Sequence, residues 1–332
     1  MGVSPFTFQL ATRIEFGEGY LTRAGAEAKK LGITKAMVIA DKGIIACGIV
    51  KPIEESLKAE HVDYVIYDQI VPNPRDVHCI AGAEFAKEHQ VDGMIAIGGG
   101  SSMDTAKAVG TLLANGGNIR TWAAPALLEN PIIPLIAVPT TAGTGSEVTF
   151  DAVITDTEAH EKLNILDLKI APKVALVDPN VLQGLPEKVM ASTGVDALIH
   201  ALEAYTCKAA SPVTDAFALY AIDLIGANIR EAVYQRTKDS CAAMMLGSTM
   251  AGVAFGYSDV AAIHCIAEAL GGRYDTPHGV ANAIILPTVM EYNAPCTGTK
   301  FKDIAVAMGV EGVEDMSQEE YRKAAVEAVK KL

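Results

Sequence analysis

The sequence contains no CxxC pair, because its six cysteines are scattered over 332 residues. This absence argues against a zinc ribbon and a disulfide framework, and it favours a reducing compartment. No apolar run reaches the roughly 18–20 residues that span a membrane, and the N-terminus lacks the basic-then-apolar order of a signal peptide. We therefore expect a cytoplasmic protein that has no membrane partner.

Basic residues are too few and too dispersed for nucleic-acid binding. Lys and Arg number 27 against 40 Asp and Glu, which gives a net charge of −13, and no basic block occurs. Half of the residues are hydrophobic, so a chain of this length can bury a large core in two domains. We expect no nucleic-acid partner.

The first half of the sequence alternates short β-branched runs with helical patterns. This alternation predicts an α/β region with a mostly parallel sheet and helices on both faces. The FDAVITD segment at 150–156 is predicted as an added strand or a hairpin arm. The strands of the sheet are predicted at residues 36–41, 63–68, 93–100, 134–141 and 174–179.

Beyond residue 185 the pattern becomes helical, with long Ala-rich segments and no convincing strand. We therefore predict an α/β domain at 1–184 and an all-helical domain at 185–332. Ligands in such architectures bind at the carboxyl ends of the strands and between domains. The last helical pattern runs to the end of the sequence, as expected if the helical domain is truncated there.

A glycine-rich turn follows the predicted strand at 93–100, in IAIGGGSSMDTAKA. Glycines let the backbone approach a ligand, and the N-terminus of the next helix offers unpaired N–H groups. These features describe a pyrophosphate cradle, although the spacing is not the G-x-G-x-x-G fingerprint. The alternative is a tight turn capped by Ser101 or Ser102.

Two further features after strands favour a nucleotide. The loop VPTTAGTGSEVT at 138–149 offers hydroxyls that suit phosphate, ribose or amide contacts. Asp41 ends the strand at 36–41, where a carboxylate can bind the adenosine ribose and repel a 2′-phosphate. NAD is therefore favoured over NADP. The alternative for Asp41 is a helix N-cap.

One aspartate and three histidines of the helical half suit a metal site. Asp196 and His200 stand four residues apart in an apolar run, which puts them on one helix face about 6 Å apart. His264 lies on another apolar helix, and His278 opens a third. This donor set suits a divalent metal such as iron(II), zinc or nickel. Taken singly, Asp196 is equally a helix cap and each histidine a buried core residue.

Glu268 follows His264 by four residues and shares its helix face. Three roles stay open for this carboxylate: a competing metal ligand, a hydrogen-bond partner of a ligand, or a proton acceptor near the substrate.

Several motifs occur in an order that resembles the iron-containing (group III) alcohol dehydrogenase family, from about residue 17 to about residue 310. The resemblance implies a dinucleotide-binding domain, a helical metal and substrate domain, and a metal in the cleft between them. It also implies reversible NAD-dependent hydride transfer between a small primary alcohol or diol and its aldehyde, with iron(II) as the expected metal. A homodimer or larger homo-oligomer is expected. The motifs are GGGSSMDTAKA, PTTAGTGSEVT, DP at 178–179 with LP at 185–186, TGVDALIHALEAY and GGRYDTPHGVANAIILP.

The resemblance also implies a role for individual residues, carried over position by position. Metal ligands are Asp196, His200, His264 and His278, the last of which is also a catalytic residue; cofactor contacts are Asp41, Asn73, Gly99, Gly100, Ser101, Asp104, Thr140, Thr141, Thr144 and Lys162; substrate-pocket residues are Asp151 and Phe255.

The sequence departs from the family pattern near His264. Glu268 stands where many members carry a second histidine that is assigned to proton relay, so we expect that role to pass to Glu268. Ala261 replaces a glycine in the same segment. Family members are also longer, and the missing end would be helical.

Three alternative functions remain at this point. Glycerol dehydrogenase-like polyol oxidation belongs to the same class. A dehydroquinate synthase-like lyase belongs to another, but its acidic phosphorylated substrate needs Lys and Arg, in which the helical half is poor near the predicted ligands. The third is a non-catalytic assembly protein, which the glycine turn and the four ligands argue against.

Overall fold

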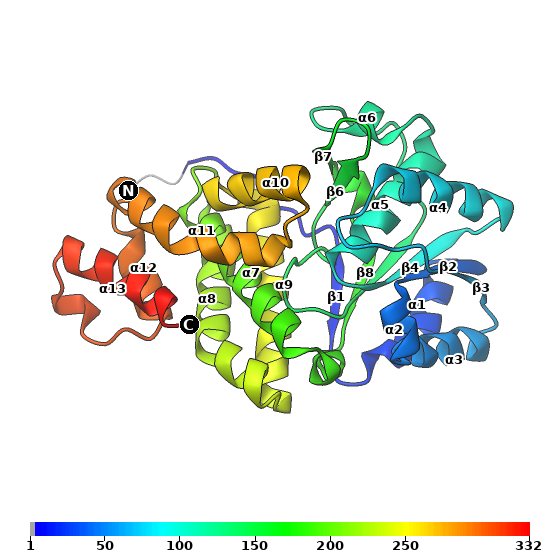
Figure 1. The fold of residues 1–332 in the computed structure, drawn as a ribbon. Coiled ribbons are helices and arrows are strands. Elements are labelled where there is room, and N and C mark those ends of the chain that lie inside the picture. The colour runs from blue at the N-terminus through cyan, green and yellow to red at the C-terminus, as the bar shows by residue number, and fades with distance from the viewer. Residues whose placement is uncertain (1–3) are drawn as a thin grey trace. The chain divides into compact units, whose positions relative to one another are not determined.

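The computed structural model describes residues 4–332, which form two compact units (Figure 1). The sheet unit comprises Leu10–Thr140 and Ser146–Val181. The helical unit comprises Leu182–Leu332, Thr141–Gly145 and the described residues before Leu10. The predicted fold class is confirmed, because strands alternate with helices in the first unit and helices alone follow.

Six parallel strands form the sheet, in the order β1-β8-β5-β4-β2-β3. The five predicted strands are all present, and the predicted hairpin arm is β6, which pairs with β7. Only β1 joins the sheet without having been predicted, since it has one exposed and three half-buried residues and no apolar run. The strands are β1 (Arg13–Phe16), β2 (Lys35–Ala40), β3 (Asp63–Tyr67), β4 (Gly93–Gly98), β5 (Leu135–Pro139), β6 (Asp151–Asp156), β7 (Glu161–Leu166) and β8 (Val174–Val177).

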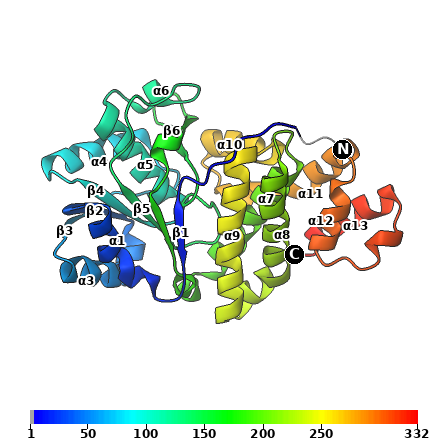
Figure 2. The same cartoon turned by 180° about the vertical axis from the view of Figure 1, so that it is seen from behind.

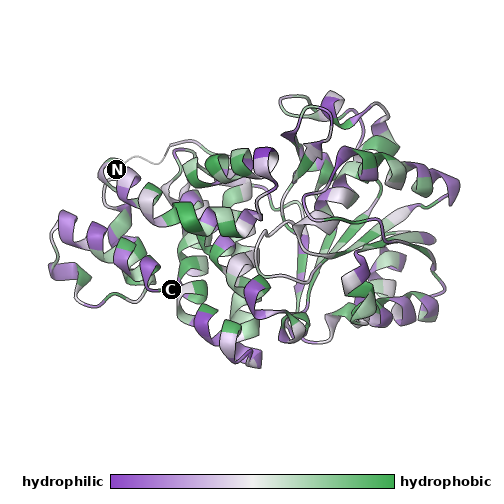
Figure 3. Cartoon of the chain, viewed as in Figure 1, coloured by the Kyte–Doolittle hydropathy of each residue, from purple (hydrophilic) through white to green (hydrophobic). Residues whose placement is uncertain are grey.

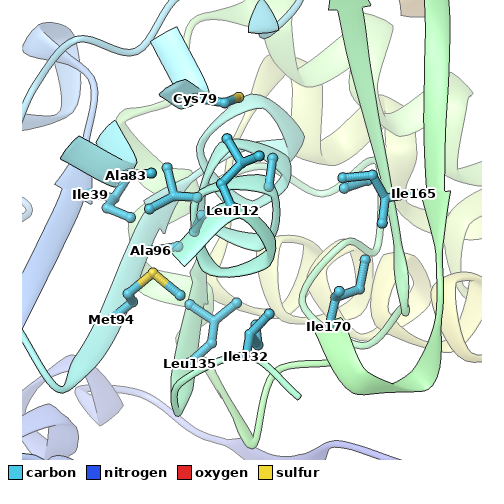
Figure 4. Packing of buried hydrophobic residues seen from close by; sticks show 14 of the residues in the cluster. Ile39, Cys79, Ala83, Met94, Ala96, Leu112, Ile132, Leu135, Ile165 and Ile170 are labelled. Atoms are coloured by element: carbon cyan, nitrogen blue, oxygen red, sulfur yellow. The ribbon is translucent and has the colours of Figure 1, made fainter. Parts of the chain in front are cut away.

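Alternate residues of the central strands enter two separate hydrophobic cores. Ile39, Met94 and Leu135 pack on one face of the sheet (Figure 4), whereas Val38 and Ile95 pack on the other. Successive side chains of a strand point to opposite faces, so a sheet that is buried on both sides reads as a continuous apolar run. The apolar colour of the central strands in Figure 3 has this origin.

Helices cover both faces of this sheet. Residues of α1 and α3 contribute to one core, and residues of α4, α5 and α6 contribute to the other. The helices of the sheet unit are α1 (Ala24–Lys30), α2 (Lys42–Ala46), α3 (Lys51–Ala59), α4 (Asp76–Glu88), α5 (Gly100–Asn115) and α6 (Ile119–Trp122).

Three long apolar helices, α7, α8 and α9, pack side by side in the helical unit (Figure 2). Helix α11 packs against α7 and α10, and α12 packs against α8 and α13. The helices are α7 (Glu187–Thr206), α8 (Pro212–Tyr234), α9 (Lys238–Ser258), α10 (Ala262–Tyr274), α11 (His278–Asn293), α12 (Lys300–Ala307) and α13 (Gln318–Lys330).

Within residues 4–332, no helix taken alone has the length and apolar composition to cross a membrane. Helices α9 and α10 meet that test only as a pair, with a bend of 97° between them. The six cysteines, all of which lie in the described range, are free thiols, as the absence of a disulfide pattern predicts.

Candidate metal and cofactor sites

Asp196 and His200 lie on one face of α7, as their spacing predicts, and both are buried. Asp196 Oδ2 and His200 Nδ1 are 3.9 Å apart. Most other buried positions of this helix are apolar, because α7 packs against four other helices, α8, α9, α11 and α12. A buried charge is costly unless it is paired, so the carboxylate of Asp196 needs partners in the interior.

Helices α10 and α11 supply those partners. His264 Nε2 lies 3.7 Å from Asp196 Oδ1, and His278 Nε2 lies 3.6 Å from the same oxygen. The ligating atoms of Asp196, His200 and His264 all fall within 4.8 Å of one another. The structure therefore brings together the four side chains that were predicted to bind the metal, with His278 on the more exposed side.

The charges in this cluster follow from burial and from the mutual contacts. Burial lowers the pKa of His200 to about 3, helped by the neighbouring imidazole of His264. Burial by itself would raise the pKa of Asp196, but the imidazoles of His200, His278 and His264 outweigh it and lower that pKa. For His264, burial opposes the charge, yet contacts with Asp196 and Glu203 raise the pKa to about 9. Near neutral pH the His264 imidazolium thus compensates the Asp196 carboxylate, and a metal bound at Nε2 would take the place of the proton on that nitrogen.

Two imidazole nitrogens of the cluster, His200 Nδ1 and His264 Nε2, are buried and find no hydrogen-bond partner among the described residues. Both are the atoms that approach Asp196. Buried polar atoms are seldom left unpaired in native proteins, and an imidazole nitrogen is a good ligand for iron, zinc or nickel. A divalent metal would satisfy both nitrogens, so the residues present fit such an ion.

Aromatic stacking fixes the ring of His200 from both sides. Its centroid lies 4.4 Å from that of Phe255, at an interplanar angle of 17°, and 4.2 Å from that of His264. Phe255, predicted to line the substrate pocket, is half-buried beside this ring. Asp151, the other predicted pocket residue, begins β6 in the sheet unit.

A close approach between α11 and α7 places His278. A Cβ on Gly279 would lie 2.6 Å from the carbonyl oxygen of Ser192, so the first turn of α11 needs a glycine there. One turn further, Asn282 Nδ2 donates to Asp196 Oδ1 at 2.7 Å and lies 3.1 Å from His278 Nε2. The buried amide of Asn282 therefore orients the carboxylate that the three histidines share.

Replacing Gly279 with alanine should push the start of α11 away from α7. We expect a loss of about 1–3 kcal/mol in the free energy of unfolding, since overpacking against rigid backbone has that cost, together with weaker metal binding through His278. Thermal unfolding and metal titration would measure both effects. Gly184→Ala is the matched control, because a Cβ on Gly184 would meet no atom within 4 Å in the described chain. Equal behaviour of the two variants would contradict this role of Gly279.

Glu268 lies on α10, one turn after His264, and is half-buried. It does not belong to the group of described residues whose ligating atoms fall within 4.8 Å of one another. His278 lies outside that group as well, so this position excludes none of the three roles that the sequence suggested.

In the sheet unit, the glycine turn leaves the N-terminus of α5 open. Gly99 is the N-cap residue and has no side chain that could cap the helix, and Ser101 and Ser102 lie within its first turn. The alternative of a cap by Ser101 or Ser102 is therefore wrong. Gly98 has φ 148°, and a Cβ there would lie 2.2 Å from Ser102 Oγ. The N–H groups at Gly100 and Ser101 and the helix dipole are features that would suit a diphosphate.

The second predicted loop begins beside this turn. Thr140 N donates to Gly98 O at 2.9 Å, because β5 and β4 are neighbours in the sheet. Thr140 Oγ1 is buried and has no hydrogen-bond partner within residues 4–332. An unpaired hydroxyl beside an uncapped helix N-terminus fits a cofactor contact. Thr141 and Thr144 follow in the segment that belongs to the helical unit.

The residues predicted to contact the adenosine part all lie in the sheet unit. Asp41 Oδ1 accepts from the N–H groups of Gly43 at 2.7 Å and Ile44 at 3.0 Å, so its N-cap role is confirmed, and Oδ2 remains for a ribose. Lys162 Nζ donates to Asn73 Oδ1 at 3.2 Å, which brings these two predicted residues together.

Lys107 was not singled out in the sequence, yet its side chain is completely buried in the sheet unit. Its Nζ donates to Ser146 Oγ at 2.8 Å, Thr149 Oγ1 at 3.1 Å and the carbonyl oxygen of Asp151 at 2.8 Å. Ser146 in turn donates to Asp104 Oδ1 at 2.8 Å, and burial raises the pKa of Asp104 to about 6. Lys107 and Asp104 thus fasten the segment that leads to Asp151 onto α5.

Two family models match the sequence. Residues 11–179 match the model described as iron-containing alcohol dehydrogenase, and residues 190–332 match the C-terminal model of the Fe-containing alcohol dehydrogenase family. The chain belongs to the iron-containing alcohol dehydrogenase family. The resemblance seen in the sequence is therefore confirmed, as is the prediction of an oxidoreductase that acts on alcohols.

Individual members of the iron-containing alcohol dehydrogenase family match most of the chain. Lactaldehyde reductase of Escherichia coli is 42% identical over 95% of this chain and 82% of that protein. The crystal structure of a 1,3-propanediol oxidoreductase superposes with a TM-score of 0.95 at 37% identity, covering 99% of this chain and 86% of that one. Sulfoacetaldehyde reductase of Bifidobacterium kashiwanohense in complex with NAD⁺ gives a TM-score of 0.87 at 26% identity, covering 98% and 86%.

The sequence alone did not single out three residues that the structure shows to be buried near the predicted site residues: Glu203, Asn282 and Lys107. Each is a polar residue in a predicted apolar helix, and each is buried. That pattern was a usable signal. Glu203 stands only three residues after His200 in the same apolar run.

Proposed function

We propose that this chain catalyses reversible hydride transfer between NAD and a small primary alcohol or diol, or the corresponding aldehyde. The observation that carries the proposal is the buried carboxylate of Asp196 among three imidazoles, two of which present unpaired nitrogens. Asp196, His200, His264 and His278 would hold the metal, with iron(II) expected and zinc or nickel as alternatives. A bound divalent metal supplies Lewis acidity toward the substrate oxygen.

The chain's own residues position the reactants. The N–H groups at the start of α5 would bind the diphosphate of NAD, and the Oδ2 of Asp41 would accept from the ribose and repel a 2′-phosphate. The NAD⁺ complex of sulfoacetaldehyde reductase supports this cofactor. Holding the nicotinamide and the carbinol carbon in contact removes the entropic cost of their encounter.

Glu268 and Phe255 would act on the substrate side. Glu268 lies half-buried on the helix of His264 and is our candidate for moving the hydroxyl proton. Phe255 covers one face of His200 and would exclude water there. Asp151, whose backbone Lys107 fixes, would contact the polar end of a diol.

The relatives' names favour a small substrate. Two of the proteins that this chain resembles are named for lactaldehyde and 1,3-propanediol, which are both three-carbon molecules. The family match favours a dehydrogenase over a dehydroquinate synthase-like lyase. Cytoplasmic location and assembly into a dimer or larger oligomer stay predictions.

A panel of small alcohols and aldehydes tests this function. The purified chain, stripped of metal and reloaded separately with iron(II), zinc or nickel, is assayed through NADH absorbance. We expect turnover of short primary alcohols or diols that depends on the added metal, and little turnover with NADP. Metal-independent turnover, or no turnover by any metal form, would contradict the proposal.

Two variants of α10, assayed with the same panel, separate metal binding from proton transfer. His264→Ala should keep only weak, still measurable metal binding and lose most of its activity. Glu268→Gln, one turn further on the same helix, should keep its metal and lower kcat by about 10²-fold, the usual range for a lost proton-transfer group. Wild-type kcat in Glu268→Gln would remove Glu268 from the mechanism.

A further inference from the structure

Helix α10 begins without a capping side chain of its own. Its N-cap residue is Ala261, which has no side-chain acceptor. The first N–H groups of an α-helix have no partner within the helix, and a buried helix start must find acceptors elsewhere. Here a single side chain of α7, Glu203, provides them.

Four donors from the start of α10 converge on the Glu203 carboxylate. The N–H of Ile263 donates to Oε1 at 2.7 Å, and those of Ala261 and His264 donate to Oε2 at 3.0 and 3.4 Å. The imidazole Nδ1 of His264 lies 2.6 Å from Oε2. Glu203 is 3% exposed, so water does not compete effectively for these bonds.

An ionised carboxylate only accepts hydrogen bonds. With Glu203 at 2.6 Å, Nδ1 of His264 must therefore carry a proton. In the neutral ring the lone pair then sits on Nε2, the atom that faces Asp196 at 3.7 Å and has no hydrogen-bond partner in the described chain. An imidazole has only two nitrogens, so a proton held on Nδ1 leaves Nε2 as the nitrogen that can bind a metal.

We infer that Glu203 is a positioning residue, which holds His264 in the tautomer and orientation that present Nε2 to the metal. The same carboxylate fastens the start of α10 to α7, so it sets the distance between His264 and Asp196 on the two helices. The inference rests on the metal site of the proposed function and adds a residue outside the four ligands.

Glutamine at position 203 tests the inference because it keeps the size and replaces one acceptor by a donor. If the NH₂ of the glutamine faces His264, it needs an acceptor there, so the imidazole proton must move from Nδ1 to Nε2. If the NH₂ faces the backbone instead, it meets N–H groups, which are donors as well, and a hydrogen bond to the start of α10 is lost. We expect the zinc affinity of Glu203→Gln to fall by about 10–100-fold, the usual effect of losing such a partner. Zinc affinity is measured by competition with a chelator, without any turnover.

Thr206→Val is the matched control. Thr206 is one turn along α7, lines the same small cavity of ≈ 20 Å³ as Glu203, and bonds only the carbonyl oxygens of its own helix. We expect its zinc affinity to match that of the wild type. NADH affinity, measured by fluorescence, should stay unchanged in both variants because the predicted cofactor contacts lie elsewhere in the chain. An equal loss of zinc affinity in both variants would overturn the inference.

A double-mutant cycle with His264→Ala separates positioning from general loosening. If Glu203 acts through the imidazole, Glu203→Gln should cost no further zinc affinity once His264 is alanine. Additive losses would show a merely structural role. If Glu203→Gln does not fold, Glu203→Asp serves in its place, because aspartate keeps both acceptor oxygens on a shorter side chain. We expect Glu203→Asp to bind zinc more weakly than the wild type. In the His264→Ala background, Glu203→Asp should cause no further loss of zinc affinity.

The outcomes also distinguish the two proposals. A wild-type chain that binds neither zinc nor iron would contradict the proposed function. Wild-type zinc affinity in Glu203→Gln, with a normal metal site otherwise, would contradict only the role of Glu203.

Discussion

Asp196→Asn should abolish tight metal binding and lower kcat/KM by roughly 10³-fold, since a Lewis-acid metal is worth several kcal/mol and each 1.36 kcal/mol is a factor of ten. The reason is geometric as well as electrostatic. All three histidines approach the carboxylate of Asp196, at 3.6–3.9 Å. Asparagine keeps the shape and can still accept from Asn282, but it removes the anionic ligand.

The metal content after dialysis and the steady-state rate with NAD(H) would measure this loss. Asp223→Asn provides the control, since Asp223 is an exposed aspartate on α8. It should change neither quantity. A fully metal-loaded and active Asp196→Asn protein would show that the cluster is not the metal site.

Gly99→Asp should weaken NAD binding by about 100-fold or more, since a fixed anion at the helix start takes the N–H groups and repels the diphosphate. The same change should leave the unliganded protein as stable as before, or more stable by up to about 1 kcal/mol, because Asp is a good N-cap. The backbone permits it: Gly99 has φ −84° and ψ −166°, an extended conformation that an L-residue adopts. Weaker NAD binding together with unchanged or higher stability would show that the substitution acts on the cofactor site and does not simply unfold the protein.

Gly99→Asn is the matched control for charge. Asn caps as well as Asp and has nearly the same shape, so it should weaken NAD binding much less. Isothermal titration or NADH fluorescence gives the affinities, and thermal unfolding gives the stability. If Asn and Asp weaken binding equally, steric blocking rather than charge is responsible. If neither variant changes the affinity, α5 does not bind the diphosphate.

The starts of helices α10 and α5 differ in whether a side chain caps them. Glu203 provides α10 with the helix cap that it lacks, whereas the start of α5 stays uncapped. Helix caps of this kind contribute about 1 kcal/mol. The start without a cap lies at the predicted cofactor site, and the capped start serves the predicted metal site.

The sequence by itself determined the local features. Apolar strands at regular spacing predicted the parallel sheet, because a strand that is buried on both faces has no polar alternation. The four-residue spacing of Asp196 and His200 put both on one face of α7, since helix geometry allows nothing else. The glycine turn between β4 and α5 followed from the same local rules. The two further histidines on apolar helices, His264 and His278, extended this pair to a metal donor set, which the family resemblance then supported.

Only the tertiary structure decided which distant residues complete these features. Glu203 meets His264 across 61 positions of the chain, and Asn282 meets Asp196 across 86. Gly279 matters because α11 passes close to Ser192 of α7. Periodicity reports which face of a helix is buried, but not which side chain of another helix lies opposite. That pairing depends on how α7, α10 and α11 pack together, and therefore on the folded chain.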